Sequence, residues 1–283
     1  YAQPFICHFT NFLIQPTGTT LMSEYVELHK KIIEKLYRYV EYHYFDANDA
    51  PQLLSKNDAV IAGNFARLIK LNVSILQHVC ECKGEILMIL LRCYIETYVN
   101  IKYFISTDNT VKEAYIKDSL SNEVKFSETI KTNITNRDGN ILDIEKRMID
   151  SINKAFSISG YQDKKVSRNY QWKSIKERVK IVVNDKDTFY NGLIGMSSHS
   201  IHGKWQDILK YNLFLKENDK FSINIEWTSP QPQLMDCVIW ANIDLLDVIK
   251  GASEITIDEY KQQLISLISR HEESLKNTHN TSK

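Results

Sequence analysis

Residues 84–105 read GEILMILLRCYIETYVNIKYFI, and no other helix-length stretch of the chain is as apolar. Leucine, isoleucine, valine and aromatic residues surround its few polar positions, which predicts a helix that is largely buried. Arg92, Glu96 and Lys102 interrupt it, and its longest uninterrupted apolar run, residues 86–91, is far shorter than a membrane span. The stretch therefore predicts a core helix, and we expect no membrane association.

The rest of the composition also favours helices. The chain has 283 residues, of which 9 are Gly and 5 are Pro, and no proline lies between Gln52 and Ser229. Turn-rich β sandwiches usually need more of these residues. Long stretches rich in Leu, Ile, Lys and Glu favour helices. An apolar fraction of 43% in a chain of this length supplies a sizeable core and excludes wholesale disorder.

Helical spacing of apolar residues recurs along most of the chain. It predicts helices over residues 21–45, 57–80, 83–106, 141–156, 171–184, 186–202, 232–250 and 257–276. Residues 211–227 instead alternate between apolar and polar side chains, which predicts a small β hairpin packed against the helical body. The fold class is therefore all-α: a single elongated helical bundle over residues 21–276, with an N-terminal arm at 1–20 and a frayed tail at 277–283.

Charge and cysteine content narrow the function classes. The 35 basic and 35 acidic residues cancel, so no overall positive field holds the chain to nucleic acid or to an anionic membrane. Five cysteines in a long chain indicate a reducing, cytoplasmic compartment and no disulfide framework. His78, Cys80 and Cys82 lie close together, but a zinc site needs a second cluster that the sequence lacks. We expect no metal and no cofactor.

Arg92, Glu96 and Asn100 follow one another at four-residue spacing, which places them in one stripe on the apolar helix. Charges on such a helix are partly buried and need partners. Two interpretations stand. The stripe is either an ion pair that fixes the position of the helix, or part of a catalytic or ligand-binding pocket.

A second group of polar residues lies in FYNGLIGMSSHSIHGKW, residues 189–205. Ser198 and His202 are four apart and share a helix face, and Gly203 suits a helix C-terminus. The negative end of the helix dipole there favours a protonated histidine. The Ser-x-x-x-His spacing does not by itself make a nucleophile and base.

The two stretches together resemble a known family. An Arg-x-x-x-Glu pair in an apolar helix, followed about a hundred residues later by Tyr190 and then Ser-x-x-x-His-Gly, resembles a bacterial family numbered 5677 among the domains of unknown function. The resemblance covers roughly residues 57–205. It implies a helical bundle from mobile or defence loci, with no established chemistry. It also implies that five side chains lie close together in the fold: Arg92, Glu96, Tyr190, Ser198 and His202.

A more distant candidate is the HEPN superfamily of helical ribonucleases. Its signature is an Arg and, a few residues later on the same helix, a His, so that Arg binds a phosphate while His moves a proton. Neither His199 nor His202 has an Arg at that spacing, whereas Arg38 and His43 do. HEPN-like chemistry would therefore need Arg92 and His202 from different helices.

A basic run with interleaved aromatic residues gives a third candidate site, and we expect it to contact nucleic acid through Lys164, Lys165, Arg168, Lys173 and Arg178. Basic and aromatic residues together can bind phosphates and stack bases. A solvated helix face after a polar loop has the same composition.

Two functions fit these residues. The first is a metal-independent, HEPN-like ribonuclease or nucleotide-acting effector of a bacterial defence or toxin system. In it, His202 is the general acid and base, Arg92 holds a phosphate, Glu96 orients Arg92, and Ser198 and Tyr190 donate hydrogen bonds. The second is a non-enzymatic protein-interaction or scaffold module, in which a buried Arg–Glu–His network is structural and the helices assemble a homodimer or bind a partner protein of a defence locus.

Overall fold

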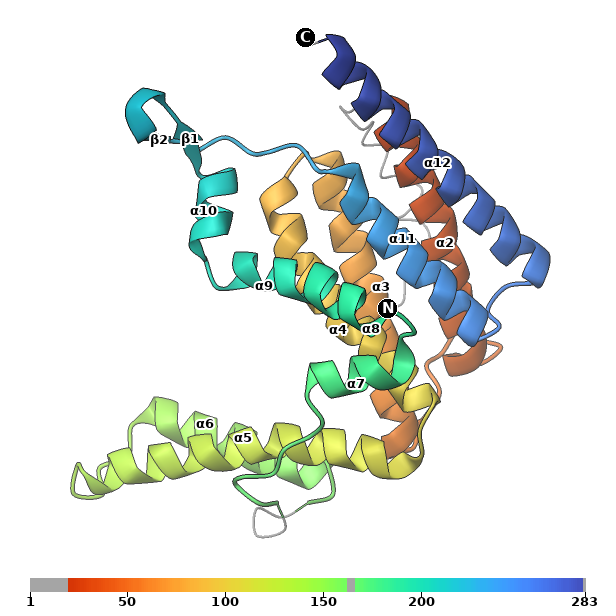
Figure 1. Cartoon of the computed structure of the whole chain (residues 1–283). Helices are drawn as coiled ribbons and strands as arrows, with labels where there is room; N and C mark the ends of the chain where they lie inside the picture. The colour runs from red at the N-terminus through yellow and green to blue at the C-terminus, as the bar shows by residue number, and fades with distance from the viewer. Residues whose placement is uncertain (1–19, 162–165, 282–283) are drawn as a thin grey trace.

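The computed structural model describes residues 20–161 and 166–281. It is predominantly helical, with one two-stranded hairpin, which confirms the predicted all-α class (Figure 1). The predicted N-terminal arm lies outside the described residues except for Thr20, where the first helix begins, and residues 282–283 of the predicted tail also lie outside them.

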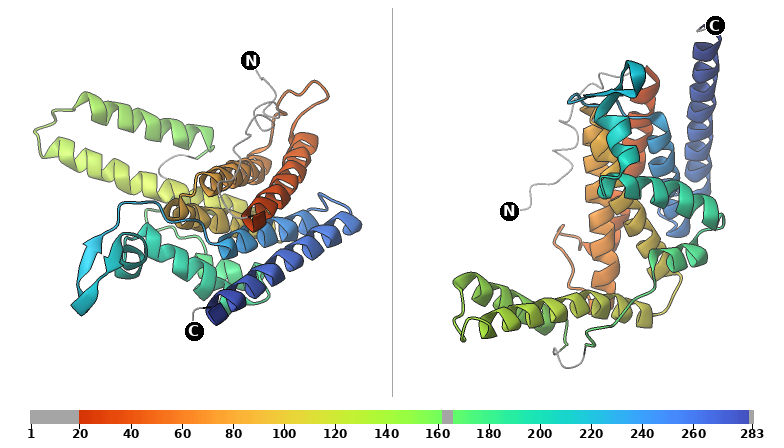
Figure 2. Two further views of the ribbon diagram at one scale, coloured as in Figure 1. Left: turned by 90° about the horizontal axis from the view of Figure 1, so that it is seen from above. Right: turned by 60° about the vertical axis from the view of Figure 1, so that its left-hand side comes forward.

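Five long helices form the main bundle: α2 (Thr20–Tyr44), α3 (Lys56–Cys80), α4 (Gly84–Ile105), α11 (Pro232–Val248) and α12 (Glu254–Thr281). Helix α4 lies at its centre and packs against α3, α11 and the later helices α7 and α9 (Figures 1 and 2). Tyr94, Ile95 and Tyr98 of α4 are completely buried. The apolar stretch 84–105 is therefore the core helix that its sequence predicts.

Helices α3, α5 and α7 each begin after a residue whose side chain satisfies a free backbone N–H group. Ser55 accepts a hydrogen bond from the N–H of Asp58 at the start of α3, and Asp108 accepts one from Thr110 at the start of α5. Ser174 and Glu177 form a reciprocal capping box at the start of α7. Pro232 begins α11, where its missing N–H costs nothing.

A buried polar network joins four helices of the bundle. His29 Nε2 of α2 lies 2.8 Å from Asn72 Oδ1 of α3, and Asn242 Nδ2 of α11 donates to the same oxygen at 2.8 Å. The Tyr94 hydroxyl of α4 donates to Asn242 Oδ1 at 2.8 Å. Burial lowers the pKa of His29 to about 4, so its imidazole is neutral in the folded protein at neutral pH.

Helix α3 is the one helix in residues 20–161 and 166–281 that is long and apolar enough to cross a membrane. Core helices of globular proteins pass the same test of length and composition. Phe65, Leu68 and Ile75 of α3 are buried in the main core, so its apolar character has a role inside the bundle.

Helices α5 (Asn109–Thr135) and α6 (Asp143–Ile158) form a helical hairpin that projects from the bundle (Figures 1 and 2). The turn between them uses Asp138 and Gly139 at positive φ, as the Asp-Gly sequence favours. The hairpin has a small core of its own, formed by Leu120, Ile130, Ile152, Phe156 and Val166. The sequence pattern predicts α6 but not α5.

The polypeptide then returns to α4 through α7 (Ile175–Val182), α8 (Lys186–Thr188), η2 (Phe189–Gly195) and α9 (Met196–Ile201). Segment η2 is a π-helix, so the predicted continuous helix 186–202 contains a wider turn. Helix α9 ends where expected: His202 is its C-cap and Gly203 has φ +54°. Glycine adopts that conformation without strain.

The segment that follows contains α10 (Trp205–Tyr211), β1 (Leu213–Leu215), η3 (Glu217–Asp219) and β2 (Phe221–Ile223). The antiparallel strands pair Leu213 with Ile223 and Leu215 with Phe221. The predicted hairpin is present, but it stands away from the bundle (Figure 1). Ile223 is 77% exposed and Ile225 is 90% exposed. The expected packing against the body is therefore wrong, because both hairpin faces meet solvent.

Candidate functional site

Arg92 of α4 holds the start of α9 by hydrogen bonds. Its Nε and Nη2 donate to Glu96 Oε1 at 3.0 and 2.5 Å. Its Nη1 donates to Ser198 Oγ at 2.6 Å and to the Ile194 carbonyl at 3.1 Å. The Arg92 side chain is only 17% exposed. Most of the N–H donors of Arg92 are therefore used inside the protein. Arg92, Glu96, Ser198 and the Ile194 carbonyl together are here called the α4–α9 clamp.

The Ser198 hydroxyl both accepts and donates a hydrogen bond. It accepts from Arg92 and lies 2.6 Å from the Ile194 carbonyl, to which it donates its only proton. A serine nucleophile needs a neighbouring base to accept its proton. Within the described ranges no imidazole or carboxylate bonds to Ser198 Oγ. The geometry is that of a structural hydroxyl.

His202 and Tyr190 lie outside the clamp. The His202 side chain is exposed, and only its backbone N–H bonds back to the helix, to the Ser198 carbonyl at 3.2 Å. The Tyr190 ring of η2 is half-buried, with Lys176 Nζ 5.5 Å from its centre. Of the five residues that the family resemblance implies, Arg92 forms hydrogen bonds with Glu96 and with Ser198. The side chains of Tyr190 and His202 take no part in this group.

Arg178 of α7 extends the polar stripe on α4. It is 9% exposed, donates to Asn100 Oδ1 and to the Lys173 carbonyl, and its guanidinium lies 4.1 Å from the centre of the Trp172 ring. Burial lowers the pKa of Arg178, while the negative charge of Glu96 acts against that shift. Glu96 therefore balances positive charge from Arg92 on its own helix and from Arg178 on α7.

Of the five residues of the predicted basic surface, the structure describes three, and one of these three is buried. Arg178 is buried and uses its donors inside the protein, so it is not accessible to a nucleic acid. Arg168 is exposed and forms a 2.9 Å ion pair with Glu128. Lys173 is exposed. Lys164 and Lys165 lie outside the described residues.

The other pair with HEPN spacing lies on α2. Arg38 donates through Nε and Nη2 to Glu34, with the shorter bond at 2.6 Å. The His43 ring packs 4.2 Å from the centre of the Tyr39 ring. Both arrangements are those of a solvated helix surface.

No group of three or more His, Cys, Asp or Glu side chains among residues 20–161 and 166–281 is arranged to hold a metal ion. His78 lies near Cys80 in the sequence, but its Nδ1 faces the Ser74 carbonyl at 2.7 Å.

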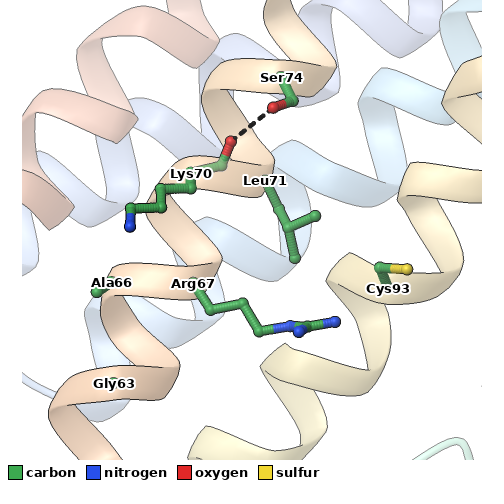
Figure 3. A pocket seen from close by; sticks show the side chains of 7 residues that line it. All are labelled: Gly63, Ala66, Arg67, Lys70, Leu71, Ser74 and Cys93. Carbon is green, nitrogen blue, oxygen red and sulfur yellow. Dashed lines mark hydrogen bonds between the residues drawn. The ribbon is translucent and has the colours of Figure 1, made fainter. Parts of the chain in front are cut away.

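A groove between α3 and α4 presents a different set of residues (Figure 3). Its volume is about 600 Å³, and it is lined by Gly63, Ala66, Arg67, Lys70, Leu71, Ser74 and Cys93. Arg67 Nε donates to Thr97 Oγ1 at 3.1 Å. Neither Arg67 nor Lys70 forms an ion pair with any residue that the structure describes.

Sequence reasoning missed this groove because its residues form no motif. The one available signal is that α3 carries Arg67 and Lys70 three residues apart and has no acidic residue between Ala59 and Cys80.

The start of helix α4 also contacts the chain that follows the β hairpin, at Thr228. The Gly84 N–H donates to the Thr228 carbonyl at 2.8 Å, and Glu85 Oε1 accepts from the Thr228 N–H at 2.8 Å. A Cβ on Gly84 would lie 2.6 Å from the Thr228 carbonyl oxygen, so glycine permits this close approach. Residues 205–227, here called the hairpin unit, are thus attached to α4 at both ends: by the clamp before them and by Thr228 after them.

The hairpin unit exposes a group of large apolar side chains, here called the hairpin patch: Trp205, Phe214, Leu215, Phe221, Ile223, Ile225 and Trp227. The Trp205 and Phe221 rings pack edge to face with their centres 5.7 Å apart, which joins α10 to the hairpin. The hydrogen bonds of Thr228 to Gly84 and Glu85 attach the segment that carries this patch to the bundle core.

These features define an all-α protein whose polar motifs hold helices together and whose apolar hairpin unit is presented to solvent. The chain belongs to the family of unknown function DUF5677, whose model matches residues 58–221. The match runs from α3 to the start of β2 and confirms the resemblance carried by the two motifs. No curated protein and no solved structure matches the chain.

Proposed function

We propose that the chain is a non-enzymatic protein-interaction module that binds its partner through the hairpin patch. The observation that carries the proposal is the exposure of this patch. Its four aromatic side chains are about half exposed and together present on the order of 400 Å² of surface. Three aliphatic side chains enlarge it. Contiguous apolar patches of this size on soluble proteins mark interaction surfaces.

The clamp supports the proposal because it accounts for the polar motif without catalysis. Arg92 bonds Glu96, Ser198 and a backbone carbonyl, and so fixes α9, from which α10 and the hairpin continue. A rigid base reduces the entropy lost when a surface is immobilised by a partner. The family resemblance adds the proposal that the partner is encoded in a bacterial defence locus and meets the chain in the cytoplasm.

The ribonuclease alternative has less support. An Arg that binds a phosphate in the transition state needs free donors, and those of Arg92 are largely used. A general acid or base needs hydrogen-bond reach to the reacting group, and the His202 ring bonds to no residue within the described ranges.

Site-specific photocrosslinking tests the interaction. A photoreactive amino acid replaces Ile225 in the full chain, and the control replaces Tyr42 on α2, which is also highly exposed. In cells that carry the natural gene, we expect one discrete protein adduct from position 225 and none from position 42. Absence of any adduct from position 225 contradicts the proposal.

A nuclease assay tests the non-enzymatic part. The purified protein is incubated with total RNA beside His202→Ala and Arg92→Ala. We expect no cleavage by any of them. Cleavage by the parent that both folded variants lose would overturn the proposal and favour the ribonuclease.

A second candidate function is favoured by the α3–α4 groove, whose lining includes two cations, Arg67 and Lys70, without ion-pair partners among the described residues. The shared chemistry of the ligand would be a phosphate group, supplied by a nucleotide or by RNA. Arg offers planar, paired donors to phosphate and Lys offers a point charge.

Titration with a fluorescent ATP analogue and with a short RNA oligonucleotide tests this candidate and separates its two sources. We expect the double variant Arg67→Ala with Lys70→Ala to weaken binding at least tenfold. The control removes two exposed cations of α2, Lys31→Ala with Arg38→Ala. Equal binding by both double variants contradicts a role for the groove.

A further inference from the structure

We propose that the partner at the hairpin patch is a second copy of this chain, and that two copies join their β2 strands edge to edge. The inference rests on the proposed function and deepens it by naming the partner. It follows from the open edge of β2, from the pattern of residues 220–226 and from the exposure of both hairpin faces.

The first step concerns which backbone groups of β2 are free. The Lys216 N–H donates to the Lys220 carbonyl at 2.7 Å, and the Asn224 N–H donates to the Asn212 carbonyl at 2.8 Å. In an antiparallel ladder, bonded and non-bonded pairs alternate. The N–H and C=O groups of Phe221 and Ile223 therefore point away from β1. The Asn224 bond to Asn212 continues this alternation one residue past the end of β2, and extending it places those of Ile225 on the same outward edge. A row of such groups is a template for another strand.

The second step concerns how that edge pairs with itself. When Ile223 lies on a two-fold axis opposite Ile223 of the second copy, Phe221 lies opposite Ile225 of the second copy. All of these residues direct their hydrogen-bonding groups outward, so the two edges can exchange bonds along this length. The same register places apolar side chains beside apolar side chains on one face of the joined sheet.

The third step is charge complementarity. In this register Lys220 lies opposite Glu226 of the second copy, and the two-fold axis repeats the contact. Ser222 lies opposite Asn224, so two short polar side chains face each other; Asn224 already bonds the Tyr211 carbonyl and the Glu226 N–H of its own chain. Opposite charges at facing positions stabilise a pair of strands, and like charges destabilise it. The segment KFSINIE, residues 220–226, is therefore complementary to itself when antiparallel.

The fourth step is the state of the hairpin alone. A two-stranded hairpin is marginal in water, whereas more strands with an apolar face are stable. The present hairpin has short strands, Leu213–Leu215 and Phe221–Ile223, and large exposed side chains on both faces. Two copies would form a four-stranded sheet with a closed two-fold interface, in which the same patch of each copy is covered.

Reversing the charge of Lys220 or of Glu226 tests the proposed register of the two β2 strands. We measure molar mass by light scattering during size-exclusion chromatography, over a range of concentrations. The parent is expected at about twice the 33.0 kDa of one chain. K220E and E226K each place like charges opposite one another, and we expect each to weaken dimerisation at least tenfold. Mixing the two variants restores opposite charges at both contacts, so the mixture is expected to dimerise.

Lys146→Glu on the exposed surface of α6 is the matched control and should dimerise like the parent. Circular dichroism of each variant confirms that the helices are retained. A monomeric parent overturns the proposal. So do K220E and E226K variants that dimerise like the parent, or a mixture of them that stays monomeric.

The crosslinking experiment separates failure of this inference from failure of the proposed function. An adduct of two copies of this chain from position 225 supports both. An adduct with a different protein, together with a monomeric parent, leaves the interaction function standing and overturns self-pairing. No adduct at all contradicts both.

Discussion

Arg92 and Arg67 are the same residue type on neighbouring helices, yet their surroundings differ. Arg92 is bonded to a carboxylate of α4, a carbonyl of η2 and a hydroxyl of α9. Arg67 has one bond to a hydroxyl, and its guanidinium faces a groove. A charged side chain whose donors are mostly used inside the protein holds the fold together, whereas one with more free donors can meet a ligand.

Replacing Arg92 measures how much the α4–α9 clamp contributes to the stability of the fold. We expect Arg92→Ala to lower the free energy of unfolding by about 2–3 kcal/mol, because hydrogen bonds to a charged group are lost. A double-mutant cycle with Ser198→Ala should give a coupling energy of about 1 kcal/mol or more. Urea denaturation provides the measurement. Arg67→Ala is the control, and a loss as large as that of Arg92→Ala would contradict the distinction.

The buried imidazole predicts a pH dependence of stability. Burial holds the pKa of His29 at about 4 in the folded protein, whereas an unfolded histidine titrates near 6.5. Between these values the unfolded state binds more protons, so stability falls as the pH drops through this window. The expected loss between pH 7 and pH 5 is about 2 kcal/mol.

His29→Gln is the matched variant, because glutamine can still donate to Asn72 but does not titrate in this range. Urea denaturation at both pH values should show a smaller loss for the variant. The same pH dependence in both proteins would assign the effect to other groups.

The sequence predicts part of the site at this scale. Four-residue spacing alone places Arg92, Glu96 and Asn100 on one stripe, and the structure has them there facing α7 and α9. That Ser198 meets Arg92 is implied only by the family resemblance, because contacts between helices far apart in sequence follow from packing. The Ile194 carbonyl could not be foreseen, since it lies at the end of a π-helix that no apolar pattern marks.

At the scale of elements, α5 and the hairpin show what apolar patterning misses. Most residues of α5 are polar, and its only buried apolar side chains are Leu120 and Ile130, ten residues apart, which is too sparse to define a helical face. The alternation in residues 221–227 predicts a strand correctly but implies one buried face, and here that face is exposed. A pattern reports that a surface is suited to burial, and a partner chain can supply that burial.

Gly84 tests the attachment of the hairpin unit to α4. We expect Gly84→Ala to destabilise the protein by about 1–3 kcal/mol, because its Cβ would overlap the Thr228 carbonyl. Hydrogen exchange should show faster exchange of the Thr228 amide. Gly63→Ala is the matched control within a helix. Nothing lies within 4 Å of its Cβ, so it should be neutral or slightly stabilising. Equal effects of the two substitutions would contradict the close contact.

At the scale of the whole molecule, the described chain has a main core and the smaller core of the α5–α6 hairpin. Few contacts join α5 to the bundle beyond its first turns, as its projection in Figure 2 shows. Regions with fewer buried apolar contacts open more readily. We therefore expect the two parts to differ in local stability.

Replacing one buried phenylalanine by alanine in each core measures this difference in local stability. Phe156→Ala should remove about 3–5 kcal/mol from the local stability of α5 and α6. Hydrogen exchange is expected to speed up in those helices and to stay unchanged in α3 and α4. Phe65→Ala in the main core should instead affect the whole bundle. Uniform acceleration by Phe156→Ala would show that the chain unfolds as one unit.

The double attachment of the hairpin unit has a consequence for how related chains can differ. Glu85 and Arg92 are two turns apart on one helix, about 10 Å along its axis, and that spacing is set by helical geometry alone. Substitutions or insertions at the tip, where Asn218 and Asp219 already adopt positive φ, leave both junctions unchanged. Changes in length or sequence at this tip are therefore expected to leave the fold of the helical scaffold unchanged.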